Sequence, residues 1–293
     1  MKSCLFTVSF AGFWGQDRLD LEQSIAKTAE LGYEGVEIMG KRPHLSVLDY
    51  SLEDCQRIGD LIEKHQLKVA AVAGYTNFTG GMDSPEVPFV EMQVDYVDQL
   101  AQRAALLGGD LVRIFSSYER DDVPFARQWQ VTIDAIRQCA DRAAIHGVKI
   151  GIQNHHDIGV DTRALEQLLV EVDRSNVVAM FDCWSIHLRG ADLAADVNRM
   201  ASKIGFTTVA DYVTIPRYRY DQQMVNYLAH DPAFVRAVPM GEGELDYTTF
   251  FAALKQVGYD GWVCYEMCSP VRDGGDMATL ERYARTFLEY MKG

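Results

Sequence analysis

The feature that most constrains this chain is a repeated alternation of short runs rich in β-branched and aromatic residues with longer amphipathic stretches. The alternation continues along all 293 residues in about eight units. Such a pattern favours parallel strands joined by right-handed helical crossovers, and eight units close a barrel. We therefore predict an α/β fold, a single (β/α)8 TIM-barrel domain over residues 1–293.

The pattern also predicts where the elements lie. Ser51 and Asp161 supply capping oxygens at helix starts, while Gly32, Gly147 and Gly258 stand where helices should end. We expect strands at 4–10, 35–38, 68–73, 111–115, 149–153, 177–181, 206–213 and 262–266, and helices at 19–31, 52–65, 87–107, 125–146, 163–172, 192–204, 247–257 and 276–291.

Composition narrows the class of protein. With 48% hydrophobic and 24% charged residues, the chain can build a large core. The net charge of -14, without a run of Lys or Arg, argues against nucleic acid and membrane surfaces as partners. The six cysteines are scattered and lack CxxC spacing, which predicts reduced thiols. Residues 1–8 do not show a signal-peptide pattern, and no apolar run is long enough to cross a bilayer, so we expect a cytoplasmic protein.

One connection is unusually long. The segment 216–244 follows the expected seventh strand, on the side of a barrel where active sites lie. We expect it to form either a lid over the substrate, with Arg217 as a substrate contact, or a contact between copies of the chain in a homo-oligomer.

Polar residues stand at several strand ends, where a barrel collects its functional groups. Asp182 and Glu266 each follow an apolar strand, so their carboxylates suit a divalent cation or proton transfer. The structural alternative is that they cap helices or pair with an arginine, either Arg113 or Arg189. The other polar residues at these ends are Glu37, Arg113, Gln153, His155, His156 and Thr208.

The histidines and tryptophans add weaker candidates. Adjacent residues leaving a strand point in opposite directions, so at most one of His155 and His156 should face the site, and we assign His155 to it. Trp14 and Trp184 are candidates for stacking on the apolar face of a sugar, although such residues also pack structurally. Cys183 and Cys268 lack an adjacent base, which argues against a thiol nucleophile.

One stretch carries a family resemblance. The motif Gly-Glu-Gly-Glu-Leu-Asp-Tyr at 241–247, the run 254–262 that leads to Glu266, and the turn and strand at 32–37 resemble the sugar phosphate isomerase/epimerase superfamily with the xylose isomerase-like TIM barrel. That superfamily includes keto-sugar epimerases and inosose dehydratases. The resemblance extends over essentially the whole chain.

The resemblance implies a divalent metal ion (Mn, Mg, Zn or Co) bound by Glu, Asp, His and Glu from strands five to eight. Asp182 and Glu266 match this pattern, but Gln153 and Thr208 replace the expected Glu and His. Losing one charge and one nitrogen donor should lower metal affinity. The site therefore either holds a cation through Gln153, Asp182 and Glu266, with His155, or has lost the metal and kept a sugar pocket.

The resemblance also implies the chemistry. We expect an isomerase or epimerase of a small-molecule carbohydrate, in which Glu266 removes the proton beside a carbonyl and a metal, Arg113 or His155 stabilises the enediolate. The same first step followed by loss of a β-hydroxyl would make a keto-inositol or keto-sugar dehydratase. A non-catalytic sugar-binding barrel is the alternative from another class.

Overall fold

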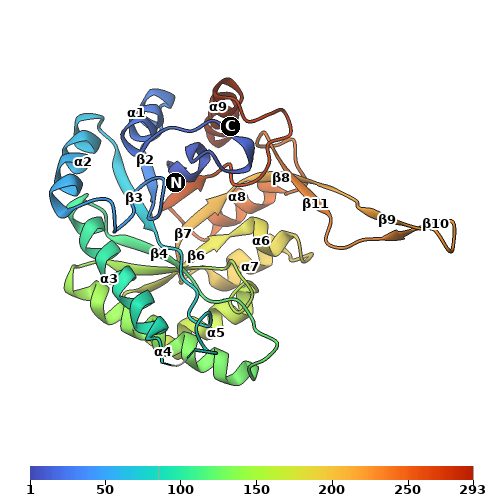
Figure 1. Ribbon diagram of the computed structural model, residues 1–293. Helices are drawn as coiled ribbons and strands as arrows, with labels where there is room; N and C mark the ends of the chain where they lie inside the picture. The colour runs from blue at the N-terminus through green and yellow to red at the C-terminus, as the bar shows by residue number, and fades with distance from the viewer. Residues whose placement is uncertain (85, 293) are drawn as a thin grey trace.

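The computed structural model describes residues 1–84 and 86–292, and eight of its strands pair in parallel into a closed barrel (Figure 1). Around the barrel the order is β1-β12-β7-β6-β5-β4-β3-β2. These strands are β1 (Lys2–Phe6), β2 (Gly35–Met39), β3 (Lys68–Ala73), β4 (Leu111–Phe115), β5 (Lys149–Gln153), β6 (Val177–Asp182), β7 (Ile204–Val209) and β12 (Trp262–Tyr265). The (β/α)8 prediction is confirmed.

Helices surround the strands (Figure 1), and the capping residues expected from the sequence begin two of them. Ser51 accepts the Asp54 N–H at the start of α2, and Asp161 accepts the Arg163 N–H at the start of α5. The helices are α1 (Leu21–Leu31), α2 (Leu52–Lys64), α3 (Phe89–Leu106), α4 (Phe125–Ile145), α5 (Thr162–Val172), α6 (Cys183–His187), α7 (Leu193–Met200), α8 (Tyr247–Gln256) and α9 (Met277–Lys292).

Strand alternation divides the barrel residues between two layers. One set packs against the helices in the main hydrophobic core, for example Val112, Ile114 and Phe181. The other set fills the barrel interior, where Leu111, Met180 and Phe206 belong to a separate small cluster. Because side chains alternate with a period of two, Arg113, Asp182 and Thr208 share the inward face with this cluster, nearer the carboxyl ends of the strands.

Two of the expected strands are shorter than predicted. The first strand ends at Phe6, and Thr7–Phe10 form a short 3-10 helix. The run at 206–213 divides at Ala210: β7 stays in the barrel, and β8 (Asp211–Ile215) leaves it to pair with β11 (Phe234–Val238). The Asp211 carboxylate accepts the N–H groups of Tyr212, Gly241 and Gly243, which turns the chain away from the barrel at this point.

The family motif at 241–247 is therefore built into this turn. Gly243 packs against Asp211, Glu244 accepts hydrogen bonds from the Thr214 N–H and hydroxyl, and Asp246 caps α8. The Tyr247 hydroxyl donates to the carbonyl oxygen of Ala210. The motif connects β11 to α8 and is hydrogen-bonded to Ala210 and to β8, so its role in this structure is architectural.

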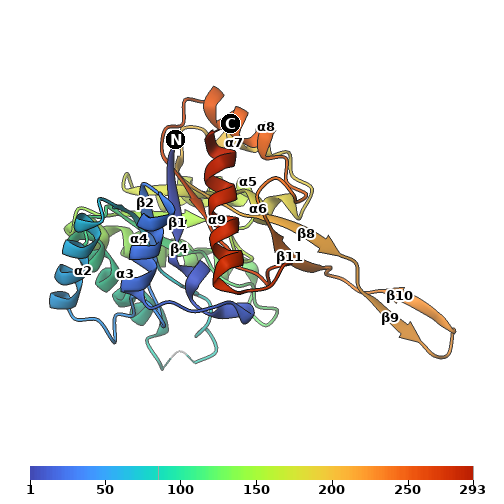
Figure 2. The same ribbon diagram turned by 90° about the horizontal axis from the view of Figure 1, so that it is seen from above.

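The long segment after β7 is ordered rather than a plain loop. The strands β9 (Tyr218–Asp221) and β10 (Asn226–Ala229) form an antiparallel hairpin, which we call the arm. Both views show the arm extending away from the barrel (Figures 1 and 2). Its side chains are largely exposed, Tyr218 and Tyr227 by about two thirds.

Two findings concern the expected location. All six cysteines are free thiols. Within residues 1–84 and 86–292, none of the helices combines the length and apolar character needed to cross a bilayer. The cytoplasmic location stays a prediction.

Candidate active site

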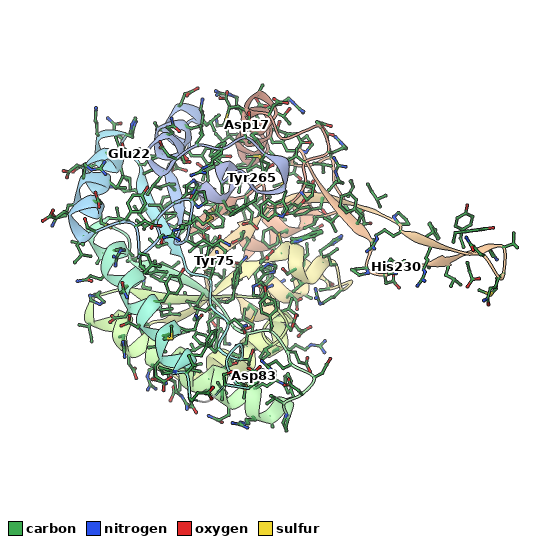
Figure 3. The ribbon with its side chains drawn as sticks, in the orientation of Figure 1. Asp17, Glu22, Tyr75, Asp83, His230 and Tyr265 are labelled. Atoms are coloured by element: carbon green, nitrogen blue, oxygen red, sulfur yellow. The ribbon has the colours of Figure 1, made fainter. Side chains whose placement is uncertain are left out.

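A cavity of about 230 Å³ opens at the carboxyl ends of the barrel strands. Aromatic and polar side chains are interleaved in its lining, with Lys41 over the Tyr75 ring and Arg113 against Phe115, and Val8 and Cys268 complete the lining. The aromatic residues are Phe6, Phe13, Trp14, Tyr75, Phe115 and Tyr118, and the polar residues are Lys41, Arg113, Gln153, His155, His156 and Glu266. Figure 3 places Tyr75 over the centre of the barrel and His230, at the base of the arm, far from it.

Arg113 lies at the floor of this cavity and is almost fully buried, with 2% of its surface exposed. Its Nη1 donates to Gln153 Oε1 at 2.9 Å, and the guanidinium lies over the rings of Phe115 and Tyr75 at 4.1 and 4.7 Å. Its Nε and Nη2 have no hydrogen-bond partner in the described part of the chain. Two donors of a buried cation are thus left for a ligand.

Asp182 is held by a dense set of donors. Its Oδ2 accepts Ser185 Oγ at 2.8 Å and Gln153 Nε2 at 3.2 Å. Its Oδ1 accepts the N–H groups of Trp184 and Ser185 at 3.0 and 3.3 Å, at the start of α6. Asp182 therefore caps a helix, the structural alternative expected from the sequence, and also holds Gln153, which lines the cavity.

His155 is tied to Asp182 through Ser185. The Ser185 hydroxyl proton goes to Asp182, so Ser185 Oγ accepts from His155 Nδ1 at 3.1 Å. The Nε2 of His155 is then the unprotonated nitrogen and can accept a proton. Burial lowers the pKa of His155 despite the charge of Asp182, which keeps the ring neutral.

Glu266 follows β12 and is 8% exposed. Burial, with the nearby charge of Asp182, raises the pKa of Glu266 to about 8, although the Cys268 thiol and Arg113 oppose the shift. A carboxyl group with a pKa near neutrality can both take up and release a proton under ordinary conditions.

The structure changes one histidine assignment. Both His155 and His156 line the cavity, so the expectation that at most one faces the site is wrong. The backbone of His156 has a φ of 64°, which interrupts the alternation of an extended strand. Its ring stacks on Tyr118 and contacts Phe115, and burial lowers its pKa to about 3.

Three other candidates lie in different settings. Trp14 lines the cavity and is 47% exposed. Trp184 packs on the ring of Tyr212, with ring centroids 3.8 Å apart, and does not line the cavity. Arg217, at the base of the arm, is exposed and donates to the carbonyl oxygen of Pro232. No arm residue lines the cavity, so the expected lid is not what this segment forms, while the homo-oligomer contact stays a prediction.

Sequence reasoning missed Lys41 and Tyr75. The Lys41 ammonium lies 3.6 Å from the centre of the Tyr75 ring, and burial together with the charge of Arg113 lowers its pKa. Each residue comes two positions after the end of its strand, β2 or β3. The rule that a barrel places functional groups at strand ends would have found both if it had been applied beyond the ends of strands two and three as it was to strands five to eight.

The four positions that the resemblance assigns to a metal do not fit one. Both oxygens of Asp182 are occupied by protein donors, and Gln153 Oε1 is occupied by Arg113. Thr208 offers a neutral, buried hydroxyl that has no partner among the residues that the structure describes. Outside Pro85 and Gly293, which the structure does not describe, no three His, Cys, Asp or Glu side chains gather closely enough to hold a metal ion.

Comparisons with known proteins agree with the fold and with the expected family. The chain is 24% identical over 253 residues to an inosose dehydratase of Lacticaseibacillus casei, covering 84% of this chain and 81% of that protein. It is 25% identical over 258 residues to an L-ribulose 3-epimerase of Methylomonas sp. (strain DH-1), covering 84% and 78%. Both enzyme classes named by the resemblance are thus represented among its relatives.

A solved structure shares the architecture. The D-psicose 3-epimerase of Clostridium cellulolyticum H10 superposes with a TM-score of 0.77 at 16% identity, covering 100% of this chain and 98% of that one. The profile of the xylose isomerase-like TIM-barrel family matches residues 25–292. This chain therefore belongs to the xylose isomerase-like TIM-barrel family.

Proposed function

We propose that the chain is a carbohydrate isomerase or epimerase that transfers a proton at the carbon beside the carbonyl of a keto sugar or a related derivative. The observation that carries this proposal is the placement of two proton-transfer groups, Glu266 and His155, in one cavity with the buried cation Arg113. The relatives that cover most of the chain act on sugars and inososes, which supports a carbohydrate as the substrate.

The lining of the cavity offers contacts to both parts of a sugar. A sugar ring presents apolar C–H groups on its faces and hydroxyl groups at its rim. Aromatic side chains such as Trp14 would contact the C–H face, and polar side chains such as Lys41 and Gln153 would bind hydroxyl groups. The cavity volume of about 230 Å³ fits a small molecule rather than a polymer.

Glu266 acts as the base in this mechanism. Its carboxylate takes the proton from the carbon beside the carbonyl, the C–H electron pair forms a C=C bond, and the carbonyl π pair moves onto oxygen. Return of a proton to the same carbon from the opposite side gives the epimer. Return to the former carbonyl carbon gives the isomer when the adjacent hydroxyl also passes its proton to the former carbonyl oxygen and becomes the new carbonyl. His155, with an unprotonated Nε2, is the second group that takes up or returns a proton.

Solvent exchange tests the proposal without knowledge of the net reaction. The protein is incubated in D₂O with L-ribulose, D-psicose, D-tagatose and an inosose, and deuterium on carbon is followed by NMR. We expect exchange with at least one of these, and none after Glu266→Gln, which is nearly isosteric. Glu242→Gln is the matched control, because Glu242 is an exposed glutamate paired with Arg272 outside the cavity.

The outcomes separate the competing functions. Wild-type exchange in Glu266→Gln would remove Glu266 as the base. Binding of these sugars without exchange would make the barrel a sugar-binding protein and refute the enzyme proposal.

A dehydratase is the second candidate, because an inosose dehydratase aligns with 84% of this chain. The same proton abstraction would then be followed by loss of the β-hydroxyl as water, with Glu266 or His155 delivering a proton to the leaving oxygen. The ultraviolet absorbance of the same samples distinguishes the two functions. A dehydratase forms an unsaturated ketone that absorbs strongly, whereas an epimerase returns a saturated sugar.

A further inference from the structure

Arg113 is an unusual group to find at the floor of a barrel. It is a permanent charge that is almost fully buried, and within residues 1–84 and 86–292 only its Nη1 is hydrogen-bonded. The nearest carboxylate oxygen, Glu37 Oε1, lies 4.0 Å from Nε, too far for a hydrogen bond. Buried charges are normally paired and fully hydrogen-bonded, so the free Nε–H and Nη2–H point to a missing ligand.

The neighbouring amide explains why this chain departs from its family at position 153. Gln153 accepts from Arg113 through Oε1 and donates to Asp182 through Nε2. Only a side chain with an acceptor at one end and a donor at the other can join an arginine to an aspartate in this way. A carboxylate at this position would bind Arg113 but would face Asp182 as a like charge.

We propose that the Arg113 guanidinium is the resident cation of this site and takes the place of the metal ion that the family resemblance implies. Its Nε–H and Nη2–H bind the carbonyl oxygen and the adjacent hydroxyl oxygen of the substrate side by side. The inference rests on the proposed function, because it assigns to Arg113 the oxygen that becomes negative when Glu266 removes the proton. The substrate class is then an α-hydroxy ketone that reacts without a metal.

The rest of the floor suits this role. The rings of Phe115 and Tyr75 cover the guanidinium and exclude water, so its hydrogen bonds to a developing oxyanion act in a medium of low polarity. Burial raises the pKa of Glu37 against the opposing charge of Arg113, which disfavours a tight ion pair between the two groups.

The first experiment measures binding rather than turnover. Glycolohydroxamate, whose two neighbouring oxygens mimic an enediolate, is titrated calorimetrically in EDTA into the wild-type protein and into Arg113→Met, Arg113→Lys and Arg236→Met. Arg236 is the matched control, a half-buried arginine that lies outside the cavity. Thermal unfolding checks the fold of each variant.

We expect wild-type and Arg236→Met to bind the hydroxamate in EDTA. In Arg113→Met the affinity should fall by at least about tenfold, because a two-pronged charged contact is lost. Deuterium exchange should fall by about 10²–10³-fold, as for other donors to an oxyanion. Arg113→Lys keeps the charge without the planar fork and should recover only part of the binding. Wild-type binding or exchange in Arg113→Met would overturn the proposal.

Gln153→Glu gives a second test in which the two alternatives predict opposite results. If Arg113 is the cation, the new carboxylate neutralises it, so hydroxamate binding and exchange fall and Mn²⁺ does not restore them. If the site is a weakened metal site, the same change adds a ligand, and Mn²⁺ binding and exchange rise together. The second result would overturn the proposal even if Arg113→Met did not fold.

The failures of the two proposals remain distinguishable. Loss of wild-type exchange in EDTA and its recovery with Mn²⁺ would overturn the role of Arg113 while leaving Glu266 as the base. Hydroxamate binding that depends on Arg113, without exchange of any keto sugar, would support the anion-binding role and refute the enzymatic one.

Discussion

Gly243 stands where any side chain would collide with the turn that directs the chain out of the barrel. A Cβ atom built on it would lie 1.9 Å from Asp211 Oδ1 and 2.6 Å from the carbonyl oxygen of Tyr212. Real Cβ atoms do not approach others so closely, so Gly243→Ala must move the backbone. That movement breaks the hydrogen bond from Gly243 N–H to Asp211 Oδ2, now 2.9 Å, and strains the one from Gly241.

The cost of Gly243→Ala follows from these contacts. Forcing a methyl group into a filled space costs about 1–3 kcal/mol, and leaving one or two buried polar groups unsatisfied adds about 1–3 kcal/mol. We therefore expect the free energy of unfolding to fall by about 4 kcal/mol, a large share of the about 5–15 kcal/mol available to a folded protein.

Urea unfolding followed by circular dichroism measures this loss, with Gly32→Ala as the control. Gly32 has a φ of 92°, and in the described part of the chain no atom beyond its own neighbours lies within 4 Å of a Cβ built there. Its substitution therefore introduces only the strain of a left-handed backbone, about 1–2 kcal/mol. A Gly243→Ala midpoint no lower than that of Gly32→Ala would refute the steric reasoning.

Two further predictions concern pH. Burial raises the pKa of Glu266 to about 8, with Asp182 and Glu37 adding to the shift and Cys268 and Arg113 opposing it. If Glu266 is the base, the rate of deuterium exchange should therefore rise between about pH 6 and pH 9, as its carboxylate form becomes populated. A rate that does not change with pH would contradict this role. Burial lowers the pKa of His44 from 6.5 to about 4, where Nδ1 contacts Thr7 Oγ1 and Nε2 contacts the Leu19 carbonyl. Below about pH 6.5 the unfolded state therefore binds a proton that the folded state does not bind until about pH 4. The free energy of unfolding should be about 2 kcal/mol lower at about pH 5 than above about pH 6.5. Urea unfolding above about pH 6.5 and at about pH 5 should show a loss that is about 2 kcal/mol smaller in His44→Gln than in the wild type. A loss remains in the variant because burial also lowers the pKa of His155 and His156, and an equal loss in both proteins would exclude His44 as a source.

Much of the fold was predictable because its signals are local. Caps at Ser51 and Asp161 involve residues within one helical turn, and the alternation of strands and helices reflects the faces that each element must bury. The exit of β8 from the barrel was not predictable, because the Asp211 carboxylate bonds to glycines about 30 positions away along the chain. A run of β-type residues at 206–213 cannot show that one position inside it starts a turn.

For the site, the sequence by itself determined which strand ends carry Gln153, Asp182 and Glu266, since position on an alternating strand selects the face of a side chain. Only the tertiary structure decided how these groups bond. The Arg113 to Gln153 to Asp182 connection links three strands, and Lys41 meets Tyr75 across two others. Donor and acceptor choices of this kind depend on distances between elements far apart in the chain, which periodicity within a single element does not encode.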